Sequence, residues 1–487
     1  MPVSTAPRFD WHTIAQDLRS IVGAQYVIHT REELVAYECD GLTSYKQTPA
    51  LVVLPKTTEE VSQILKLCHD RQIPFVPRGA GTGLSGGALP VADSLLIVTA
   101  RMNRILQVDI DNRYVVVQPA VINNWVTQAV SGAGFYYAPD PSSQSICSIG
   151  GNIAENSGGV HCLKYGVTVN HVLGMTIVLP TGEIEQVGGF VPEMPGYDLT
   201  GVFVGSEGTL GIATEIILKI LPIPQTVQVL LADFTSIEGA GQAVADIIKS
   251  GIIPAGMEIM DHLSINAVAK TVATNCYPLD AQAILLVEVD GTRAEVEAVS
   301  QQIQQIFRDN GARSSQIAET PQERAKLWQG RKSAFAAMGK LSPNYYVQDG
   351  VIPRSQLPFV LKEIDQLGQK YGYPVANVFH AGDGNLHPLI LYDQKQEGAL
   401  ERVEHLGGAI LKLCVQVGGS ISGEHGIGAD KRCYMETMFS PADLETMQWL
   451  RQAFDPQGIA NPTKVIPTPA TCGDRRIPTH LTDIPRF

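Results

Sequence analysis

Two histidines and a Glu-His pair in the second half of the chain have the residue types of a metal and acid–base site. His380 and His387 flank the turn sequence Ala-Gly-Asp-Gly between two apolar, strand-like stretches, which can bring both imidazoles to one place. Glu424 and His425 add a carboxylate and another imidazole in a glycine-flanked loop. Two imidazoles and a carboxylate with open positions suit a divalent transition metal, namely zinc, manganese or iron. Spacing alone still favours the simpler interpretation, in which these histidines are unrelated and satisfied by hydrogen bonds.

A glycine-rich stretch, PRGAGTGLSGG at residues 77–87, is the clearest feature of the first half. Glycines leave backbone N–H groups open to a ligand, and such a loop suits phosphate. Residues 81–86 also match G-x-G-x-x-G, the pattern of NAD-binding Rossmann domains. A Rossmann loop must open a helix, whereas the residues that follow include Pro90 and lack helical periodicity. A loop between two strands therefore fits better, and a glycine-rich turn without a ligand is the remaining alternative.

Two further clusters of small residues lie in the same half of the chain. They are DPSSQSICSIGGNIAENSGG, within residues 139–159, and GSEGTLGI at residues 205–212. Three such clusters imply one extended ligand that touches the backbone at three places. A dinucleotide is about that long.

The flanking sequence predicts the elements that position these motifs. An apolar strand at residues 50–56, a helix opened by a capping box of Thr57 and Glu60, and a strand at residues 73–77 form a βαβ unit that leads into the glycine-rich loop. Residues 227–320 follow the order β-α-β-β-α-β, a ferredoxin-like layout. No internal repeat is visible.

Composition limits the class of protein. A chain of 487 residues is too long for one hydrophobic core and predicts about two or three domains. The net charge of -13 gives no indication that the protein binds nucleic acid or anionic lipid. No apolar run approaches the length of a membrane-spanning helix, and the N-terminus lacks a signal or transit pattern, so we expect a cytoplasmic protein.

Cysteine usage argues against a second redox centre within the chain. The eight cysteines are scattered and form no C-x-x-C motif, which disfavours an iron–sulfur cluster or a cysteine-based zinc site. We expect them to be reduced, structural thiols.

Taken together, these motifs resemble the vanillyl-alcohol-oxidase or PCMH type of FAD-linked oxidoreductases. RGAGTGLSGG is similar to the pyrophosphate loop of that family, PDPSS with SIGGNIAENSGG to its second FAD segment, and VGSEGTLGI to its third. Within the family, the chain resembles the branch that contains the glycolate oxidase and D-lactate dehydrogenase flavoproteins, over residues 15–465.

The resemblance implies an α+β fold. Its parts are a PCMH-type FAD-binding domain of two α/β subdomains, a ferredoxin-like cap domain and a C-terminal helical segment that returns to the FAD domain. The implied division is an N-terminal lead-in (1–46), the FAD-binding domain (47–225), the FAD-linked oxidase C-terminal domain that binds substrate (226–465) and a Pro-rich tail (466–487).

The resemblance also implies which residues hold FAD. The pyrophosphate would be held by Arg78, Gly79, Gly81, Thr82, Gly83 and Ser85. The ribityl and isoalloxazine portion would meet Asp140, Ser143, Ser148, Gly150, Gly151, Asn152 and Gly158, and the adenosine and pyrimidine would meet Glu207, Gly208 and Ile212. Asn461 lies in the returning C-terminal segment. Thr82 stands where some relatives attach the flavin covalently through a histidine, so we expect noncovalent FAD.

The same resemblance makes His380, His387 and Glu424 metal ligands and His425 the general base. A cation that binds the carboxylate and hydroxyl oxygens of a 2-hydroxy acid lowers the pKa of the hydroxyl group while hydride leaves for the flavin. Arg331 lies on a predicted helix that begins at Thr320, in the family's W-x-x-R arrangement, and would clamp the substrate carboxylate. A solvated arginine on a helix surface is the alternative.

Two positions bear on substrate size. Relatives that act on 2-hydroxyglutarate carry an Asn and a Thr where this chain has Leu389 and Phe335. Apolar side chains offer no partner to a second carboxylate, whose burial would cost several kcal/mol. A small acid, glycolate or D-lactate, is therefore expected, and the sequence does not choose between these two.

The expected function is a metal-assisted flavoprotein dehydrogenase with an external electron acceptor. That acceptor would be an iron–sulfur partner subunit, a quinone or a soluble carrier. The sequence does not decide whether a partner also attaches the protein to the membrane surface. The alternatives are a noncovalent FAD oxidase that reduces oxygen directly, a non-catalytic flavin-binding subunit and, least favoured, an NAD-dependent Rossmann dehydrogenase.

Overall fold

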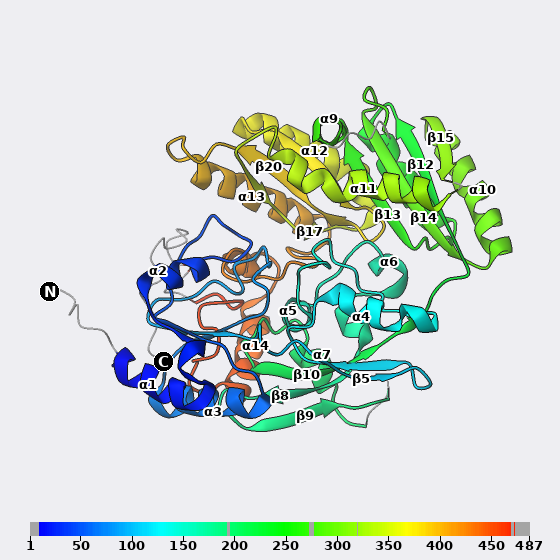
Figure 1. Cartoon of the computed structure of the whole chain (residues 1–487). Coiled ribbons are helices and arrows are strands. Elements are labelled where there is room, and N and C mark those ends of the chain that lie inside the picture. The colour runs from blue at the N-terminus through cyan, green and yellow to red at the C-terminus, as the bar shows by residue number, and fades with distance from the viewer. Residues whose placement is uncertain (1–8, 192–194, 272–276, 319, 469–471, 473–487) are drawn as a thin grey trace. The chain divides into compact units, whose positions relative to one another are not determined.

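The computed structural model describes residues 9–191, 195–271, 277–318, 320–468 and 472, and these form two compact units (Figure 1). The first unit contains the chain up to Ser157, Val167–Pro222 and the chain from His425 onward. The second contains Gly158–Gly166 and Ile223–Glu424. The two units thus interleave along the chain, whereas the expected division at residue 226 is linear.

The first subdomain of the first unit is a four-stranded sheet covered by helices. Its strands run in the order β1 (Val27–Ile28), β2 (Leu51–Val53), β4 (Leu95–Val98) and β3 (Phe75–Arg78), with α1 (Trp11–Val22), α2 (Arg31–Leu34) and α3 (Thr58–Arg71). Strands β2, β4 and β3 are parallel. Thr57 caps α3 by accepting a hydrogen bond from the Glu60 amide at 3.2 Å, so the predicted βαβ unit is confirmed.

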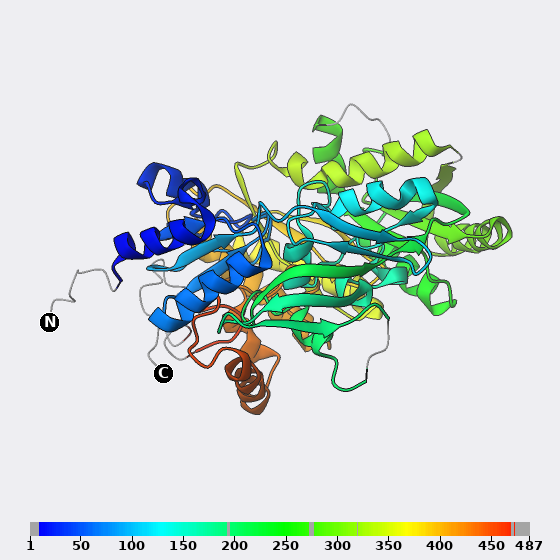
Figure 2. The ribbon, with the colours of Figure 1, turned by 60° about the horizontal axis from the view of Figure 1, so that its bottom comes forward.

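The second subdomain is a five-stranded antiparallel sheet, whose cyan and green strands lie side by side in Figure 2. The order is β5 (Ile105–Asp109), β6 (Tyr114–Val117), β10 (Ile212–Lys219), β8 (Val172–Val178) and β9 (Ile184–Gly188). Along β10 buried and half-buried residues alternate, because one face of the sheet packs on a core that includes Ile149, Phe203 and Ile216. Shorter elements complete this part: α4 (Asn123–Val130), β7 (Phe135–Tyr136), α5 (Ile149–Glu155), α7 (Leu199–Phe203) and β11 (Leu221–Pro222).

The C-terminal segment returns to the first unit, as predicted. After α14 (Pro441–Phe454), the chain runs beside β3. The Phe75 amide donates to the Ile459 carbonyl at 2.9 Å, and the Asn461 amide donates to the Phe75 carbonyl at 2.8 Å. This segment is thereby held at the strand that leads into the glycine-rich loop.

The second unit contains the predicted ferredoxin-like layout. Its elements are β12 (Thr226–Phe234), α8 (Ile237–Lys249), β13 (Gly256–Asp261), β14 (Ala283–Gly291), α10 (Arg293–Asp309) and β15 (Ala312–Ala318), with the sheet order β15-β12-β14-β13. An additional helix, α9 (His262–Thr271), lies between β13 and β14 and was not predicted. It begins at the end of the strand because Asp261 Oδ1 accepts the Ser264 amide at 2.8 Å.

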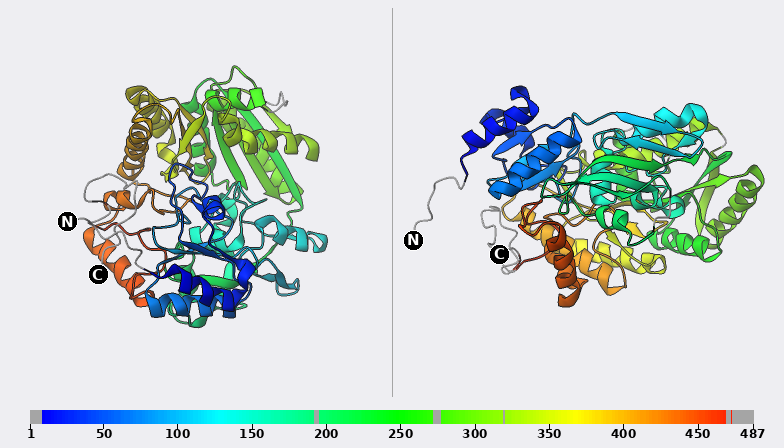
Figure 3. Two further views of the ribbon diagram at one scale, coloured as in Figure 1. Left: turned by 60° about the vertical axis from the view of Figure 1, so that its left-hand side comes forward. Right: turned by 90° about the horizontal axis from the view of Figure 1, so that it is seen from below.

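The ferredoxin-like sheet continues through β18, as the left panel of Figure 3 shows for the long green strands and the yellow strands beyond them. The remaining elements of the unit are α6 (Cys162–Tyr165), α11 (Pro321–Met338), β16 (Asn344–Val347), β17 (Gly350–Val351), α12 (Leu357–Tyr371), β18 (Val375–His380), β19 (Asn385–Leu386), β20 (Pro388–Tyr392) and α13 (Ala399–Gln416). The register of β13 and β18 places Glu258 directly opposite His380. Residues 381–384 form the predicted turn between β18 and β19.

One expectation about the cysteines was wrong. Cys433 and Cys472 form a disulfide with their Cα atoms 5.6 Å apart. The 39-residue separation between them carries no signal for such a pairing in the sequence, because only the fold of the returning segment brings them together. The rest of the expected Pro-rich tail, apart from residues 466–468 and Cys472, lies outside the described residues.

Among the described residues, no helix combines the length and the apolar character that crossing a bilayer requires.

Asp40 provides a test of the packing of the first unit. Its side chain is 5% exposed, and burial raises the pKa of the carboxyl group from 3.8 to about 6, against the opposing effect of the Leu42 amide. Between these two pH values the folded protein keeps a proton that the unfolded chain releases, so stability falls as the pH rises through this window. We expect Asp40→Asn to stabilise the protein more at pH 8 than at pH 4, by about 3 kcal/mol for the full shift.

Thermal unfolding of both proteins at the two pH values measures this difference. Asp111→Asn, at an exposed position, is the control and should show the same small effect at both values. An Asp40→Asn effect that does not change with pH would contradict the assignment.

Candidate active site

The glycine-rich loop leaves its backbone open, as predicted. Residues 79–94, which follow β3, contain no helix. The amides of residues 81–87 donate no hydrogen bond to the part of the chain that the structure describes. Only at the start of the loop does an amide have a partner, since Ala80 donates to Ser148 Oγ at 3.2 Å. A row of such N–H groups forms an anion-binding concavity.

The second cluster packs against this loop through Ser148. Ser148 is the N-cap of α5, a short helix that was not predicted, and its Oγ accepts the Gly151 amide at 3.4 Å. A Cβ added to Gly79 would lie 2.2 Å from the same oxygen. Gly150 is confined in a similar way, since its added Cβ would lie 2.6 Å from Pro119 Cβ. Glycine at position 79 thus allows the close approach of these two clusters, and glycine at position 150 allows the contact with Pro119.

The third cluster and the returning C-terminal segment meet the same loop. Gly208 has a φ of 68°, and a Cβ there would lie 2.3 Å from Pro77 Cγ, at the entry to the loop. Asn461 donates through Nδ2 to the carbonyls of Gly87 (2.9 Å) and Glu207 (2.6 Å). The fold of the first unit thus brings together the three clusters that are separated in the sequence.

Several predicted FAD-binding residues carry buried polar atoms without a hydrogen-bond partner among the described residues. These atoms are Arg78 Nε, Ser85 Oγ, Asn152 Nδ2 and Asn461 Oδ1. Because a buried polar group without a partner costs about 1–3 kcal/mol, the cluster favours a polar ligand with several donors and acceptors. The open amides and these side chains fit the pyrophosphate and sugar of FAD.

Other predicted FAD-binding residues have additional or different surroundings. Glu207 is buried, and its carboxylate accepts the amides of Ile427 (2.6 Å) and Gly428 (2.7 Å), so it anchors the loop that follows His425. Gly158 begins the inserted segment of the second unit, and its added Cβ would lie 2.9 Å from Glu424 Oε2. The remaining positions stay predictions: Gly81, Thr82 and Gly83 lie in the open loop, Asp140 and Ser143 are half-buried, and Ile212 is buried at the start of β10.

The second unit brings His380, His387 and Glu424 together. Glu424 Oε1 lies 3.3 Å from His380 Nε2 and 3.1 Å from His387 Nε2. One ligand atom from each of the three residues lies within 4.8 Å of the others. His380 Nε2 is buried and makes no hydrogen bond of acceptable geometry to the described residues. Two imidazole nitrogens and one carboxylate that converge in this way fit a divalent metal such as zinc, manganese or iron.

The charges of this cluster are strongly coupled. Burial alone would lower the pKa of His380, but the neighbouring carboxylates of Glu258 and Glu424 outweigh it and raise that pKa well above its ordinary value. Burial would raise the pKa of Glu424, but His380 and His387 hold it well below its ordinary value. In the protein without a bound cation, protonated imidazole thus balances the carboxylates. A metal would replace that proton.

Glu258 and Arg331 extend the cluster. Arg331 is 3% exposed, and its Nε donates to Glu258 Oε2 at 2.6 Å. The other oxygen of Glu258 lies 2.5 Å from His380 Nδ1. The alternative of a solvated Arg331 is therefore wrong, because the guanidinium is buried and bound to the carboxylate that contacts His380. Glu258 itself was missed, although an acidic residue inside the apolar strand sequence GMEIMD is a signal for a buried, partnered carboxylate.

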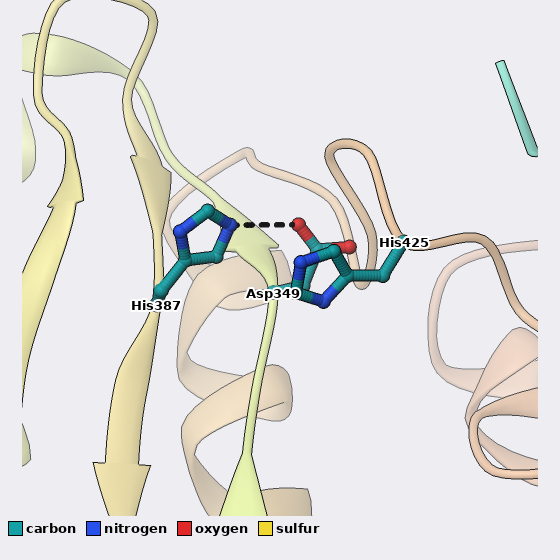
Figure 4. A group of neighbouring side chains, drawn as sticks. All are labelled: Asp349, His387 and His425. Atoms are coloured by element: carbon teal, nitrogen blue, oxygen red, sulfur yellow. Dashed lines mark ion pairs between the residues drawn. The ribbon is translucent and has the colours of Figure 1, made fainter. Parts of the chain in front are cut away.

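Asp349 was also missed. It is fully buried, and it accepts the amides of Gly423 (3.1 Å) and Glu424 (3.2 Å) and the Ser422 hydroxyl (2.7 Å). Figure 4 shows its ion pair with His387, at 3.5 Å between Oδ1 and Nε2. Asp349 therefore holds the end of the segment that carries Glu424. Nothing in the local sequence QDGV indicates this role.

His425 is the first residue of the returning stretch of the first unit. Three residues further on, the loop is fixed by Glu207, and the amides of Ala429 and Asp430 donate to the Ser85 carbonyl at 3.0 Å. Gly426 has a φ of 82°, and a Cβ there would lie 2.1 Å from Glu155 Oε2. The glycine after His425 is thus required by both backbone conformation and space.

Replacing Gly79 with alanine tests the cofactor loop. Because the new methyl group would displace Ser148 Oγ, it would break the hydrogen bonds of that oxygen to Ala80 and Gly151 and separate the first two clusters. We expect Gly79→Ala to be purified with less than about a tenth of the wild-type FAD content, on the basis that a displaced polar contact costs 1–3 kcal/mol. The flavin absorbance per protein measures this content. Gly132→Ala is the matched control, since no atom lies within 4 Å of its added Cβ, and equal FAD loss in both variants would contradict the assignment.

Two family models match the chain. The FAD binding domain matches residues 49–188, and the C-terminal domain of FAD linked oxidases matches residues 223–465. The first match begins before the glycine-rich loop and ends at β9. The second covers the whole candidate metal centre and the segment with Asn461.

Individual relatives agree with these models. Glycolate oxidase subunit GlcD of Escherichia coli K12 is 50% identical over 468 residues, which cover 96% of this chain and 94% of the relative. A D-lactate dehydrogenase of Anaerostipes hadrus is 33% identical, over 86% of this chain and 90% of the relative. Among solved structures, p-cresol methylhydroxylase with bound substrate matches with a TM-score of 0.77 at 16% identity, over 95% of this chain and 98% of that one, and it shows the fold alone. The chain therefore belongs to the vanillyl-alcohol-oxidase or PCMH type of FAD-linked oxidoreductases, in the branch of the GlcD proteins of glycolate oxidase and the D-lactate dehydrogenases.

Proposed function

We propose that the chain is an FAD-dependent dehydrogenase that oxidises a small 2-hydroxy acid, glycolate or D-lactate, with the help of a divalent metal. The observation that carries the proposal is the convergence of His380, His387 and Glu424, with Arg331 tied to the same cluster through Glu258. The names of the relatives, glycolate oxidase subunit and D-lactate dehydrogenase, support the same substrate class.

Arg331 binds the carboxylate of the acid in this proposal. Two of its nitrogens face Glu258, since both Nε and Nη2 lie 2.6 Å from Oε2. The remaining N–H groups of the guanidinium have no other partner among the described residues and match the geometry of a carboxylate. Fixed by Glu258, the side chain loses little conformational entropy when it binds the acid.

His425 removes the proton of the substrate hydroxyl group. A divalent metal held by His380, His387 and Glu424 would lower the pKa of that hydroxyl group, and FAD would supply the hydride acceptor. An imidazole suits the proton transfer because it ionises near neutral pH. Glu424 and His425 are consecutive, so the segment that supplies a metal ligand also supplies the base.

Apolar side chains limit the size of the acid. The Phe335 ring lies edge-on to His387, with 6.1 Å between ring centroids, and Leu389 is fully buried. Neither can pair with a second carboxylate, which would be left unpartnered at a cost of several kcal/mol. This disfavours 2-hydroxyglutarate and favours acids without a distal charge.

The electrons must leave the reduced flavin for an acceptor outside the chain. The sequence has no C-x-x-C motif for an iron–sulfur cluster, and Cys433 is paired with Cys472. An iron–sulfur partner subunit, a quinone or a soluble carrier would accept them, and the word subunit in the name of the E. coli relative favours the first. Direct reduction of oxygen is the alternative, and hydrogen peroxide formation would reveal it.

Anaerobic titration of the purified protein with single acids tests the proposal. We expect glycolate or D-lactate to bleach the flavin absorbance near 450 nm, and L-lactate and D-2-hydroxyglutarate to leave it unchanged. Removal of the metal by a chelator should abolish bleaching, and added metal should restore it. His425→Ala should slow bleaching by about 100-fold or more, the usual effect of losing a general base.

His405→Ala is the matched control, because His405 is an exposed histidine on α13 and its replacement should leave the bleaching rate at the wild-type value. If FAD is bound and none of the four acids bleaches it, the proposed substrate class is wrong.

A further inference from the structure

Glu258 lies where two functional side chains meet. It is the middle of β13, fully buried, and its neighbours Met257, Ile259 and Met260 are buried apolar residues. The strand register places it opposite His380 on β18. From the other side Arg331 reaches it from α11. A carboxylate at such a position costs several kcal/mol to bury unless both of its oxygens are used.

The two oxygens of Glu258 serve different partners. Oε1 lies 2.5 Å from His380 Nδ1, while Oε2 lies 2.6 Å from both Nε and Nη2 of Arg331. A carboxylate accepts hydrogen bonds, so His380 Nδ1 carries a proton, and Nε2 is the nitrogen left to offer a lone pair to a bound cation. The same carboxylate therefore sets the tautomer of one candidate metal ligand and the direction of the candidate substrate clamp.

We propose that Glu258 is a positioning residue that couples the candidate metal centre to Arg331. The coupling makes metal affinity depend on Arg331, which is no ligand, and makes binding of the acid depend on Glu258, which does not touch it. This inference rests on the roles that the proposed function gives to His380 and Arg331.

A neutral side chain cannot perform both tasks. The amide of glutamine has one oxygen and one NH₂ group, so it can accept from His380 or from Arg331, and its NH₂ group then faces the other donor. If that donor is His380, the ring must place its proton on Nε2, where a metal would bind. If it is Arg331, the guanidinium loses its anchor.

Asp261 separates this role from a merely structural one. It lies on the same strand, and its Oδ2 accepts the backbone amide of Asn377 on β18 at 2.6 Å. It is half-buried, and it is a hydrogen-bonded acid between the same two strands as Glu258. It contacts neither His380 nor Arg331 in the described structure. Asp261→Asn is therefore the control for loss of a hydrogen-bonded carboxylate between these two strands.

The first test measures metal binding without turnover. A chelator removes the metal from the holoprotein, which keeps its FAD. The protein is then titrated with Mn²⁺ alone, and electron paramagnetic resonance measures the concentration of free Mn²⁺. We expect Glu258→Gln to bind Mn²⁺ about 10–100-fold more weakly than wild type, the usual loss when a partner behind a metal-bound histidine is removed. Asp261→Asn should stay within about 2-fold. In steady state, Glu258→Gln should also raise the KM for glycolate or D-lactate at saturating Mn²⁺.

The second test reads the coupling itself. Arg331→Gln removes a positive charge and leaves Glu258 with His380 as its main partner. This change makes His380 Nε2 a stronger electron-pair donor to a metal. We therefore expect Arg331→Gln to tighten Mn²⁺ binding by at least ~3-fold, opposite in sign to the effect of general damage. In the Glu258→Gln background the same change should have less than half of this effect, because the coupling residue is gone.

Unchanged Mn²⁺ affinity in Glu258→Gln, or equal weakening in Asp261→Asn, would overturn the inference. If Glu258→Gln does not fold, as judged by circular dichroism and FAD content, Arg331→Gln decides alone, and unchanged or weaker Mn²⁺ binding there refutes the coupling.

Wild-type protein that binds neither Mn²⁺ nor Zn²⁺ would remove the metal centre of the proposed function and this inference with it. Wild-type protein that binds metal but is bleached by no acid would refute the substrate class, while the Mn²⁺ cycle would still decide on Glu258.

Discussion

The antiparallel pairing of β13 with β18 is the constraint on which the chemistry of the second unit depends. It sets Glu258 opposite His380, and the turn at residues 381–384 then reverses the chain, so that His387 follows between β19 and β20. A shift of one residue in this register would turn Glu258 to the other face of the sheet. Both faces of β13 are buried, so the same shift would also exchange the packing partners of the apolar residues around Glu258, and their packing holds the register.

The candidate sites of the two units consist of different chemical groups. In the first unit the groups that face a ligand are mainly backbone amides, and glycines at positions such as Gly79 and Gly208 allow strands and loops to approach closely. Such a site carries little net charge and suits the long, polar chain of a dinucleotide. In the second unit the groups are buried ionised side chains. Glu258, Asp349 and Glu424 together outnumber the permanent positive charge of Arg331, so burial is tolerable only with protonated histidines or a bound cation.

Local patterns in the sequence predicted most of the fold. The N-cap Thr57, the apolar strands and the βαββαβ order of the second unit depend on near neighbours, so they are visible without a structure. The full capping box expected there is not formed, because the Glu60 carboxylate accepts the Lys56 amide. The glycine clusters and the two histidines were recognised because their residue types are unusual. By contrast, Glu258 contacts Arg331, which is 73 residues away in the sequence, and His380, which is 122 residues away. Cys433 likewise pairs with Cys472 across the returning segment. Interactions of this kind are set by tertiary structure alone. The capping role of Asp261 was not predicted because helix α9 follows strand β13 directly, with no loop between them.

The peptide bond between Glu424 and His425 shows how closely the site is tied to the chain path. On its N-terminal side, Asp349 accepts the amides of Gly423 and Glu424, so the carboxylate is fixed within the second unit. On its C-terminal side, Glu207 accepts the amides of Ile427 and Gly428, so the residues after His425 are fixed within the first. Both anchors are buried carboxylates that bind backbone, and each lies only a few residues from the bond. Loss of either anchor would leave a buried carboxylate without its donors. The glycines of the sequence SGEHGIG are required by other close contacts, since an added Cβ would lie 2.5 Å from Asn385 at Gly423 and 2.1 Å from Ser85 at Gly428. The glutamate and the histidine between them are the side chains left to do chemistry.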